Sequence, residues 1–437
     1  MNNKISRRQL LKILGAAAGG VGLAKLLETS VPFLLAQELN KHLYLPMLLH
    51  KGSLMPPSTP TPTATATSTA TSTATVTDSR TPTPTATPTG TRTPGSTRAK
   101  VVHVHAAGAT SWNFSSGWYG DYVDQAIVND MVDEGLKQLT GRSTVAAAWQ
   151  ALLPGYASGK GIAIKVNFNN TSSASCAYNG NIIDSLIEPV NALIRGMKLT
   201  GVRETDIWVY DASRAIPARF RSRCPYAGVR FLDRFLDVSC AERASFSSND
   251  PDAQVHFGNP KLSQRRISDV AINATYLINV PIVKDHGIAG VTLGFKNHFG
   301  TIDTVEKGGE DSLHLNLGNL TNNPQVDIYL NPHIRNKTAL IVGDGLFGAL
   351  GNTNVAPSRW QSFGNDASNS LFFGTDPVAV DCVMFDILDA DPAYHPRGDG
   401  HMDNYLKAAA SAGLGTFERG DPWGSGYQQI SYQKIER

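Results

Sequence analysis

The sequence predicts an α/β fold, with a mostly parallel β-sheet flanked by helices, preceded by a signal segment and a disordered Thr/Pro-rich tether. Three observations lead to this prediction. Short β-rich runs alternate with helical patterns from Val101 onward, which is typical of a parallel sheet with helices on both faces. The chain opens with basic residues followed by a short apolar run. A long stretch of Thr and Pro then separates this start from the rest of the 437 residues.

Residues 1–37 are predicted to be an export signal. Arg7 and Arg8 precede the uncharged segment Ile13–Ala24, which has twelve residues and is too short to span a bilayer. Paired arginines before a weakly apolar run resemble a twin-arginine signal, so we expect the twin-arginine export machinery as a partner. The protein is then periplasmic, on the cell surface or extracellular. Residues 38–55 form a short apolar, juxtamembrane segment, and tethering to a membrane or envelope through an uncleaved signal is the alternative.

Residues 56–99 are predicted to be a disordered linker. They contain 18 Thr and 8 Pro, no aromatic residue and four charges. Such a composition cannot bury enough apolar surface to offset the entropy of ordering the chain. The linker is expected to hold the body, residues 100–437, away from an envelope.

The charge of the body argues against nucleic acid as a partner. Residues 1–100 carry 11 basic and 3 acidic side chains, whereas the remaining residues carry 28 basic and 34 acidic ones. Binding to phosphate backbones needs a basic face, which a mildly acidic body does not provide.

The elements of the body follow from local patterns. Helical spacing predicts a helix capped by Asp121, and Gly201 marks the end of a long amphipathic one. Asp376 followed by Pro377 is a typical helix start. The predicted strands are Val101–Ala106, Gly161–Phe168, Asp206–Asp211, Thr275–Val283, Thr338–Val342 and Ser370–Phe373. The predicted helices are one after Asp121, one at Asn181–Leu199, one from Asp376 to about Leu388 and one at Asp403–Ala412.

Polar residues stand at or just beyond the ends of these predicted strands. In parallel sheets, ligands bind at the carboxyl ends of strands. The residues in question are Asn167, Asn169, Asp211, Lys284, Asp344 and Asp376. Asp376 has a structural alternative as a helix cap, and the nearby Asp381 could act only on the helix dipole.

Five segments together resemble the family called domain of unknown function 362, over roughly residues 160–390. They are Ile164–Asn167 (IKVN), Val209–Asp211 (VYD), Gly294–Gly300 (GFKNHFG), Val342–Gly345 (VGDG) and Thr375–Asp381 (TDPVAVD). Some members of this family carry a ferredoxin-like cluster of cysteines. This chain has only Cys176, Cys224, Cys240 and Cys382, far apart in sequence, so it looks like an exported single-domain member without such a cluster.

The densest polar segment runs from Lys284 to His298 and predicts an anion site among glycines. Lysine supplies positive charge for phosphate or carboxylate, and histidine can move protons near neutral pH. The alternative is a solvated Gly-rich loop. The predicted catalytic residues are His286, His298 and Asp344, and the predicted cofactor-binding residues are Asn167, Asp211, Lys284, Lys296 and Asn297. We expect these distant side chains to line one cleft; the cofactor is not identified.

Three further motifs are a histidine pair, a Gly-rich segment and the cysteines. His103 and His105 would face one side of a strand and could bind a metal with Asp211, Asp344 or Asp381, but a structural role is favoured and no metal site is assigned. Gly343–Gly348 matches the dinucleotide pattern without a following helix, and is predicted to be a Gly-rich loop that positions Asp344. Cys224 and Cys240 are the expected disulfide pair, and Cys382 a buried thiol.

Three functions remain open from the sequence. The first is an exported protein that binds an anionic small molecule or cofactor and acts enzymatically on it, with the reaction unknown. The second is a non-catalytic cell-surface binding module on a tether. The third is a redox accessory protein, as the cluster-bearing members of the family suggest.

Overall fold

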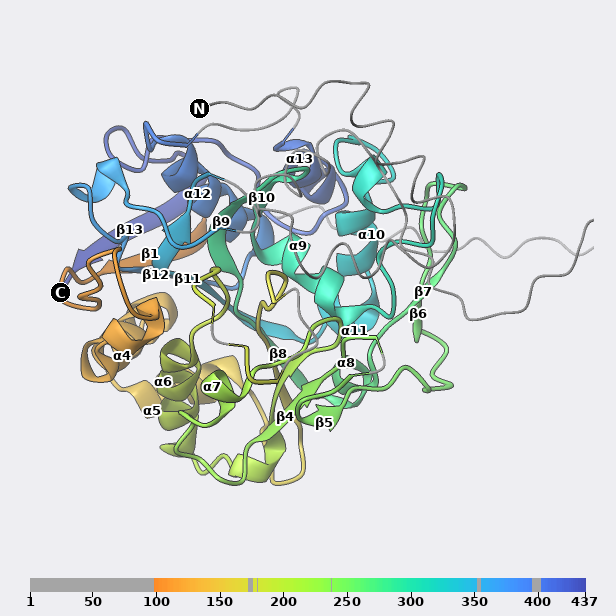
Figure 1. Ribbon diagram of the computed structural model, residues 1–437, viewed down its shortest axis with the longest axis horizontal. Coiled ribbons are helices and arrows are strands. Elements are labelled where there is room, and N and C mark those ends of the chain that lie inside the picture. Colours follow the sequence, from red (N-terminus) through yellow and green to blue (C-terminus); the bar gives the residue numbers. More distant parts are fainter. Residues whose placement is uncertain (1–97, 172–175, 179, 237, 352–354, 395–401) are drawn as a thin grey trace, which may run out of the picture. The chain divides into compact units, whose positions relative to one another are not determined.

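The computed structural model describes residues 98–171, 176–178, 180–236, 238–351, 355–394 and 402–437 (Figure 1). All of them belong to the unit that spans Gly90–Arg437. The predicted signal and juxtamembrane segments and nearly all of the predicted tether lie outside the described residues. Among the described residues, no helix has the length and apolar character needed to cross a membrane.

One large sheet organises the body, and the predicted α/β class is confirmed (Figure 1). In the principal path of this 11-stranded sheet, β12 alone runs antiparallel to its two neighbours, β1 and β11, while the other pairings are parallel. The strands in spatial order are β13 (Ile430–Glu436), β1 (Ala99–His105), β12 (Ser370–Gly374), β11 (Thr338–Ala349), β8 (Tyr276–Asn279), β2 (Ile162–Lys165), β3 (Ile207–Asp211), β4 (Arg230–Asp233) and β5 (Glu242–Arg243).

A side branch leaves this path next to the site described below. Strand β9 (Ile282–His286) pairs with β11 in parallel and with β10 (Gly290–Thr292) in a hairpin. A separate two-stranded sheet contains β6 (Gln254–Val255) and β7 (Arg265–Arg266).

Helices cover both faces of the sheet and create two apolar cores (Figure 1). One face packs against α4 (Gln125–Thr140), α5 (Val145–Leu152), α6 (Ile187–Lys198) and α7 (Ala218–Arg221). The other packs against α8 (Asp269–Asn273), α9 (Gly294–Asn297), α10 (Pro324–Tyr329), α11 (Pro332–Arg335), α12 (Pro377–Asp389) and α13 (Asn404–Ser411). Alternation along the strands divides the side chains, since Val101 lies in the second core and Val102 in the first.

Short 3₁₀ turns complete the described chain. They are η1 (Tyr119–Tyr122), η2 (Glu204–Asp206), η3 (His298–Thr301), η4 (His314–Asn316) and η5 (Gln361–Phe363). Of these, η3 follows α9 directly, so that residues 294–301 form one compact helical segment.

Two predicted helix starts were wrong. Helix α4 is capped by Asp124, whose carboxylate accepts hydrogen bonds from the backbone N–H groups of Ala126 and Ile127, and Asp121 belongs to the preceding 3₁₀ turn. Helix α6 begins at Ile187 rather than Asn181, because the residues before it are tied to other segments. Asp184, for example, accepts a hydrogen bond from the Thr171 hydroxyl at 2.7 Å.

Three predicted strands have clearly different limits from those expected. The run Gly161–Phe168 is shorter, since β2 covers only Ile162–Lys165. The run Thr275–Val283 is two strands, β8 and β9, separated at Val280 and Pro281, because proline has no N–H to donate to a sheet. Strand β11 continues through Gly343–Gly348, where a loop was predicted. A Cβ on Gly343 would lie 2.2 Å from the Met384 sulfur, so this glycine permits close packing of α12 on the strand.

The predicted disulfide was also wrong. Cys176 pairs with Cys240, across 64 residues, and Cys224 is a free, half-buried thiol. Nearness in sequence was a poor guide, since the parallel strands β2, β3 and β4 bring the loops that follow them together. Cys382 is a buried free thiol, as predicted.

Candidate functional site

A cleft of about 500 Å³ opens at the carboxyl ends of β2 and β3. Its walls come from the loops that follow these two strands, from the turn after β4, from several residues between Thr292 and Glu306, and from His314. Parallel strands end at one edge of the sheet, so residues far apart in sequence meet there. Four of the eight predicted site residues line this cleft, namely Asn167, Asp211, Lys296 and Asn297.

A buried ion pair forms the floor of the cleft. The Nζ atom of Lys165, the last residue of β2, lies 3.2 Å from an Asp211 carboxylate oxygen at the end of β3, and both side chains are almost completely buried. Lys165 also donates to the Asn297 side-chain oxygen at 3.3 Å. Burial lowers the pKa of Lys165, and the Asp211 charge opposes this shift.

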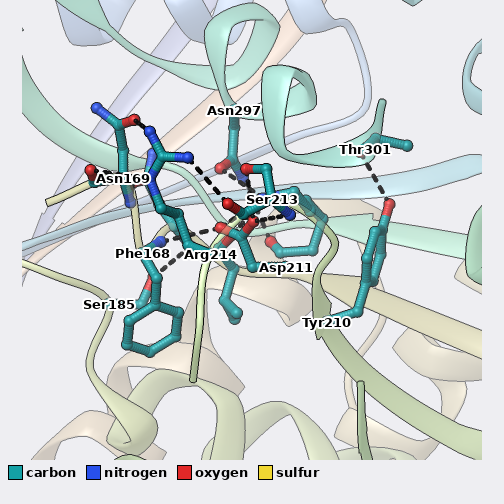
Figure 2. A network of polar contacts seen from close by, with 12 residues as sticks. Phe168, Asn169, Ser185, Tyr210, Asp211, Ser213, Arg214, Asn297 and Thr301 are labelled. Carbon is teal, nitrogen blue, oxygen red and sulfur yellow. Dashed lines mark hydrogen bonds and ion pairs between the residues drawn. The ribbon is translucent and has the colours of Figure 1, made fainter. Parts of the chain in front are cut away.

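Asp211 also fixes the loops on either side of it (Figure 2). One carboxylate oxygen accepts the backbone N–H of Phe168 at 3.0 Å, and the other accepts the N–H and the hydroxyl of Ser213. Asn167 shapes the first loop further, because its side-chain oxygen accepts the N–H of Asn169 at 3.0 Å. The side chains of the cleft floor are therefore held by the sheet and by their own turns.

Helix α9 is anchored from two sides. The Asn297 amide donates to the Asn279 side-chain oxygen at 2.7 Å, and Asn279 donates to the Gly294 carbonyl at 2.9 Å. From α12, the buried Asp381 accepts the backbone N–H groups of Gly294 and Phe295. Asp381 thus caps α9 rather than acting only on its own helix dipole, and burial raises its pKa to about 7.

Gly300 lies where the α9–η3 segment contacts the Lys165–Asp211 ion pair. Its carbonyl accepts the N–H of Ala212 at 2.8 Å. A Cβ at this position would lie 2.5 Å from the Lys165 Nζ atom and 2.7 Å from an Asp211 carboxylate oxygen. The GFKNHFG segment therefore approaches the strand ends as closely as it does only because glycine has no side chain.

Three polar side chains that line the cleft contact one another in series. The Nζ atom of Lys296 lies 3.1 Å from Nε2 of His314, and Nδ1 of His314 lies 2.5 Å from a Glu306 carboxylate oxygen. Lys296 is buried, and its Nζ atom sits 3.7 Å from the centre of the Phe299 ring. Burial, together with the charges of Lys284 and Arg214, holds the pKa of Lys296 well below its usual range.

Two of the other predicted site residues, His286 and Lys284, contact residues of the cleft wall but do not line the cleft themselves. His286 stacks on His314 with ring centres 5.6 Å apart, and its Nδ1 accepts the N–H groups of Ile288 and Ala289. Lys284 is fully buried, with Thr292 as a neighbour at 3.4 Å, and burial lowers its pKa to about 8. Neither residue is part of the cleft lining.

The remaining two predicted residues lie away from the cleft. His298 is enclosed between Thr301 and the Tyr329 ring, and burial lowers its pKa to about 3. Asp344 accepts the N–H of Leu346 and is buried, with its pKa raised to about 7. Its neighbours in register along β11 belong to the core under α4–α6, on the face of the sheet opposite α9. The expectation that Lys296 and Asp344 share one opening was wrong, because β11 does not end where predicted.

The His103 and His105 pair has ordinary hydrogen-bond partners. His103 is buried between the Tyr432 and Ser370 hydroxyl groups, each at 2.8 Å, and His105 pairs with Glu436. Within the described part of the chain, no three His, Cys, Asp or Glu side chains are grouped as metal ligands.

Sequence reasoning missed five residues of the site. Lys165 stands inside the IKVN segment but within a predicted strand, Arg214 follows Asp211 by three residues, and Arg234 directly follows β4. Glu306 and His314 lie in irregular chain that carries no motif. A search for basic residues just beyond each strand end would have found Arg214; nothing in the sequence alone places His314 beside Lys296.

The fold and the site define an α/β protein with a cleft, lined by two lysines and two arginines, at the carboxyl edge of a mostly parallel sheet. The family model Domain of unknown function (DUF362) matches residues 162–386, which is more than half of the chain and includes nearly all of this cleft. The chain therefore belongs to the DUF362 family. No curated protein matches it.

Proposed function

We propose that the cleft binds an anionic small molecule, a carboxylate or a phosphate ester, and that the protein acts on it as an enzyme. The observation that carries this proposal is a set of cations without carboxylate partners. Arg214, Arg234 and Lys296 line the cleft, and among the described residues none of the three forms an ion pair with a carboxylate. Lys165, in contrast, is already paired with Asp211.

The guanidinium of Arg214 is oriented without being neutralised. It donates to the Ser213 carbonyl at 2.9 Å and to the side chain of Asn169 at 3.3 Å, and it lies 5.5 Å from the centre of the Phe235 ring (Figure 2). Contacts of this kind fix a planar donor while leaving its positive charge for a ligand. A bound anion would also relieve the repulsion between Arg214 and Lys296.

Thermal unfolding in the presence of an anion panel tests this function. The panel contains short carboxylates, hydroxy acids, inorganic phosphate and phosphate esters, added to the full chain at low ionic strength. Binding to the folded protein stabilises it and raises Tm, and this effect grows with the logarithm of ligand concentration over Kd once the ligand is in excess. We expect at least one anion to raise Tm in the wild type, and to lose this effect in Arg214→Gln.

The matched control is Arg142→Gln, because Arg142 is exposed after α4 and does not line the cleft. This variant should respond to the anion as the wild type does. If no anion in the panel raises Tm, or if Arg214→Gln responds like Arg142→Gln, the proposed function is wrong.

Export remains part of the proposal. It is supported by Arg7 and Arg8 ahead of a short apolar run, and by a disulfide between Cys176 and Cys240, which persists best in an oxidising compartment. Replacing both arginines by lysine should retain the protein in the cytoplasm, as cell fractionation would reveal. Unchanged export of that variant would contradict the twin-arginine route.

A further inference from the structure

The three buried lysines in and around the cleft differ in the groups that their Nζ atoms contact. Lys165 faces a carboxylate at 3.2 Å, which favours the ammonium form. Lys284 faces a hydroxyl and a carbonyl at 3.4 Å and does not line the cleft. Lys296 lines the cleft and faces an imidazole nitrogen and an aromatic ring. Of these three, Lys296 alone combines access to the cleft with a proton acceptor that is not an anion and so does not hold the amine in its ammonium form.

The imidazole of His314 is held in one orientation. It stacks on His286 at 5.6 Å and meets the edge of Phe299 at 5.7 Å, which restricts rotation of the ring. Glu306 at Nδ1 favours the tautomer with the proton on Nδ1. Nε2 then presents a lone pair to the Lys296 amine, so a proton on that amine has a place to go.

We propose that Lys296 is a nucleophilic amine that forms an imine with the carbonyl carbon of an anionic substrate such as a 2-oxo acid. This inference rests on the proposed function, since Arg214 and the other cations of the cleft hold the substrate's anionic group. Arg214 and Lys296 both line the cleft, whose volume of about 500 Å³ suits a small molecule.

The chemistry balances without a further reagent. The Nζ lone pair of Lys296 attacks the carbonyl carbon, a C–N bond forms as the C=O π bond breaks, and His314 Nε2 carries one proton from the nitrogen to the oxygen, which becomes a hydroxyl group. His314 Nε2 then carries the second proton from the nitrogen to that hydroxyl group, which leaves as water when the C–O bond breaks and the C=N bond forms. His314 thereby acts as a proton carrier, and Glu306 as the residue that positions it.

Reductive trapping of the wild-type full chain tests the inference directly. Glyoxylate, pyruvate and 2-oxoglutarate are each added with sodium borohydride, which converts an imine to a stable secondary amine, and adducts are located by peptide mass spectrometry. We expect Lys296 to be modified at least about tenfold faster than the exposed Lys160 with at least one probe. Absence of preferential labelling at Lys296 with all three probes would overturn the inference.

Two further measurements separate this inference from the binding proposal. The matching hydroxy acids glycolate, lactate and 2-hydroxyglutarate carry the same anionic group without a carbonyl, and their effect on Tm reports anion binding alone. Stabilisation by a hydroxy acid without trapping at Lys296 contradicts the imine and leaves the anion site intact. The absence of trapping contradicts the imine, and if no anion of the whole panel raises Tm either, both proposals are contradicted.

The role of His314 has its own variant. His314→Phe keeps a flat ring against His286 and Phe299 but removes the proton acceptor. We expect trapping at Lys296 to slow by at least about tenfold while stabilisation by the hydroxy acid persists. Trapping at the wild-type rate would show that His314 carries no proton for Lys296.

Discussion

A single buried side chain, that of His298, is expected to make the stability of the protein depend on pH. His298 is enclosed, with Thr301 beside its Nδ1, the Tyr329 ring across it and the charge of Lys165 nearby. Burial and, to a lesser extent, the charge of Lys165 favour the neutral imidazole, which is why its pKa falls to about 3. In the unfolded chain the same group takes up a proton near pH 6.5.

The free energy of unfolding should therefore decrease as pH falls through this window. Between about pH 6.5 and pH 3 the unfolded chain binds a proton on His298 that the folded chain does not, and a full shift of this size is worth about 5 kcal/mol. Urea unfolding of wild type and His298→Gln from pH 7 to pH 4 should show a shallower decline for the variant. Parallel curves would indicate that His298 is protonated in the folded protein.

Gly300 offers a second test at the scale of one residue. Gly300→Ala places a methyl group against the Lys165–Asp211 pair, and overpacking of this kind typically costs about 1–3 kcal/mol. We expect a lower Tm and weaker anion binding. Gly351→Ala is the control, because a Cβ there would meet no atom within 4 Å. Equal Tm values and equal anion affinities of the two variants would show that the Lys165–Asp211 pair tolerates displacement.

Among the elements, α9 depends most on residues from elsewhere in the chain. It has four residues, too few to be stable by itself, and Asp381 of α12 supplies the acceptor for its first N–H groups. Asp381→Ala leaves two buried N–H groups unpaired and should lower the free energy of unfolding by about 2–4 kcal/mol. It should also weaken anion binding, because α9 carries Lys296 and Asn297.

Asp376→Ala separates stability from site geometry. Asp376 caps α12 itself, by accepting the N–H groups of Val378 and Ala379, and is not part of the cleft. Loss of this cap should cost about 1 kcal/mol and leave anion affinity unchanged. Urea denaturation measures the stability of both variants, and titration with the anion measures their affinity. The account of α9 fails if Asp381→Ala binds the anion as tightly as Asp376→Ala does.

At the scale of the whole molecule, one covalent link joins loops that border the strand ends. The Cys176–Cys240 disulfide closes a loop of 64 residues, and removal of such a link typically costs about 2–4 kcal/mol. The double variant Cys176→Ser, Cys240→Ser should unfold at lower urea concentration than the wild type. Cys224→Ser is the control, since Cys224 is unpaired. A double variant as stable as the control would contradict a stabilising role for the link.

The sequence predicted the class of fold well because the α/β pattern is local. Hydrophobic runs and helix caps such as Asp376 are readable within a few residues. It predicted half of the candidate site, since strand ends such as Asn167 and Asp211 mark one edge of a parallel sheet. It failed for Asp344, because pairing with β12 extends β11 beyond the predicted end. It also missed His314, whose position depends on tertiary packing alone.

The central claim is that cations at this edge of the sheet form an anion site, and isothermal titration calorimetry measures it most directly. The anion that raises Tm most in the panel is titrated into wild type, Arg214→Gln and Arg142→Gln. Loss of a charged hydrogen bond is worth about 1.5–3 kcal/mol, so Arg214→Gln should raise Kd by about tenfold or more. Arg142→Gln should leave Kd within about twofold of the wild type. Equal Kd values for all three proteins would contradict the claim.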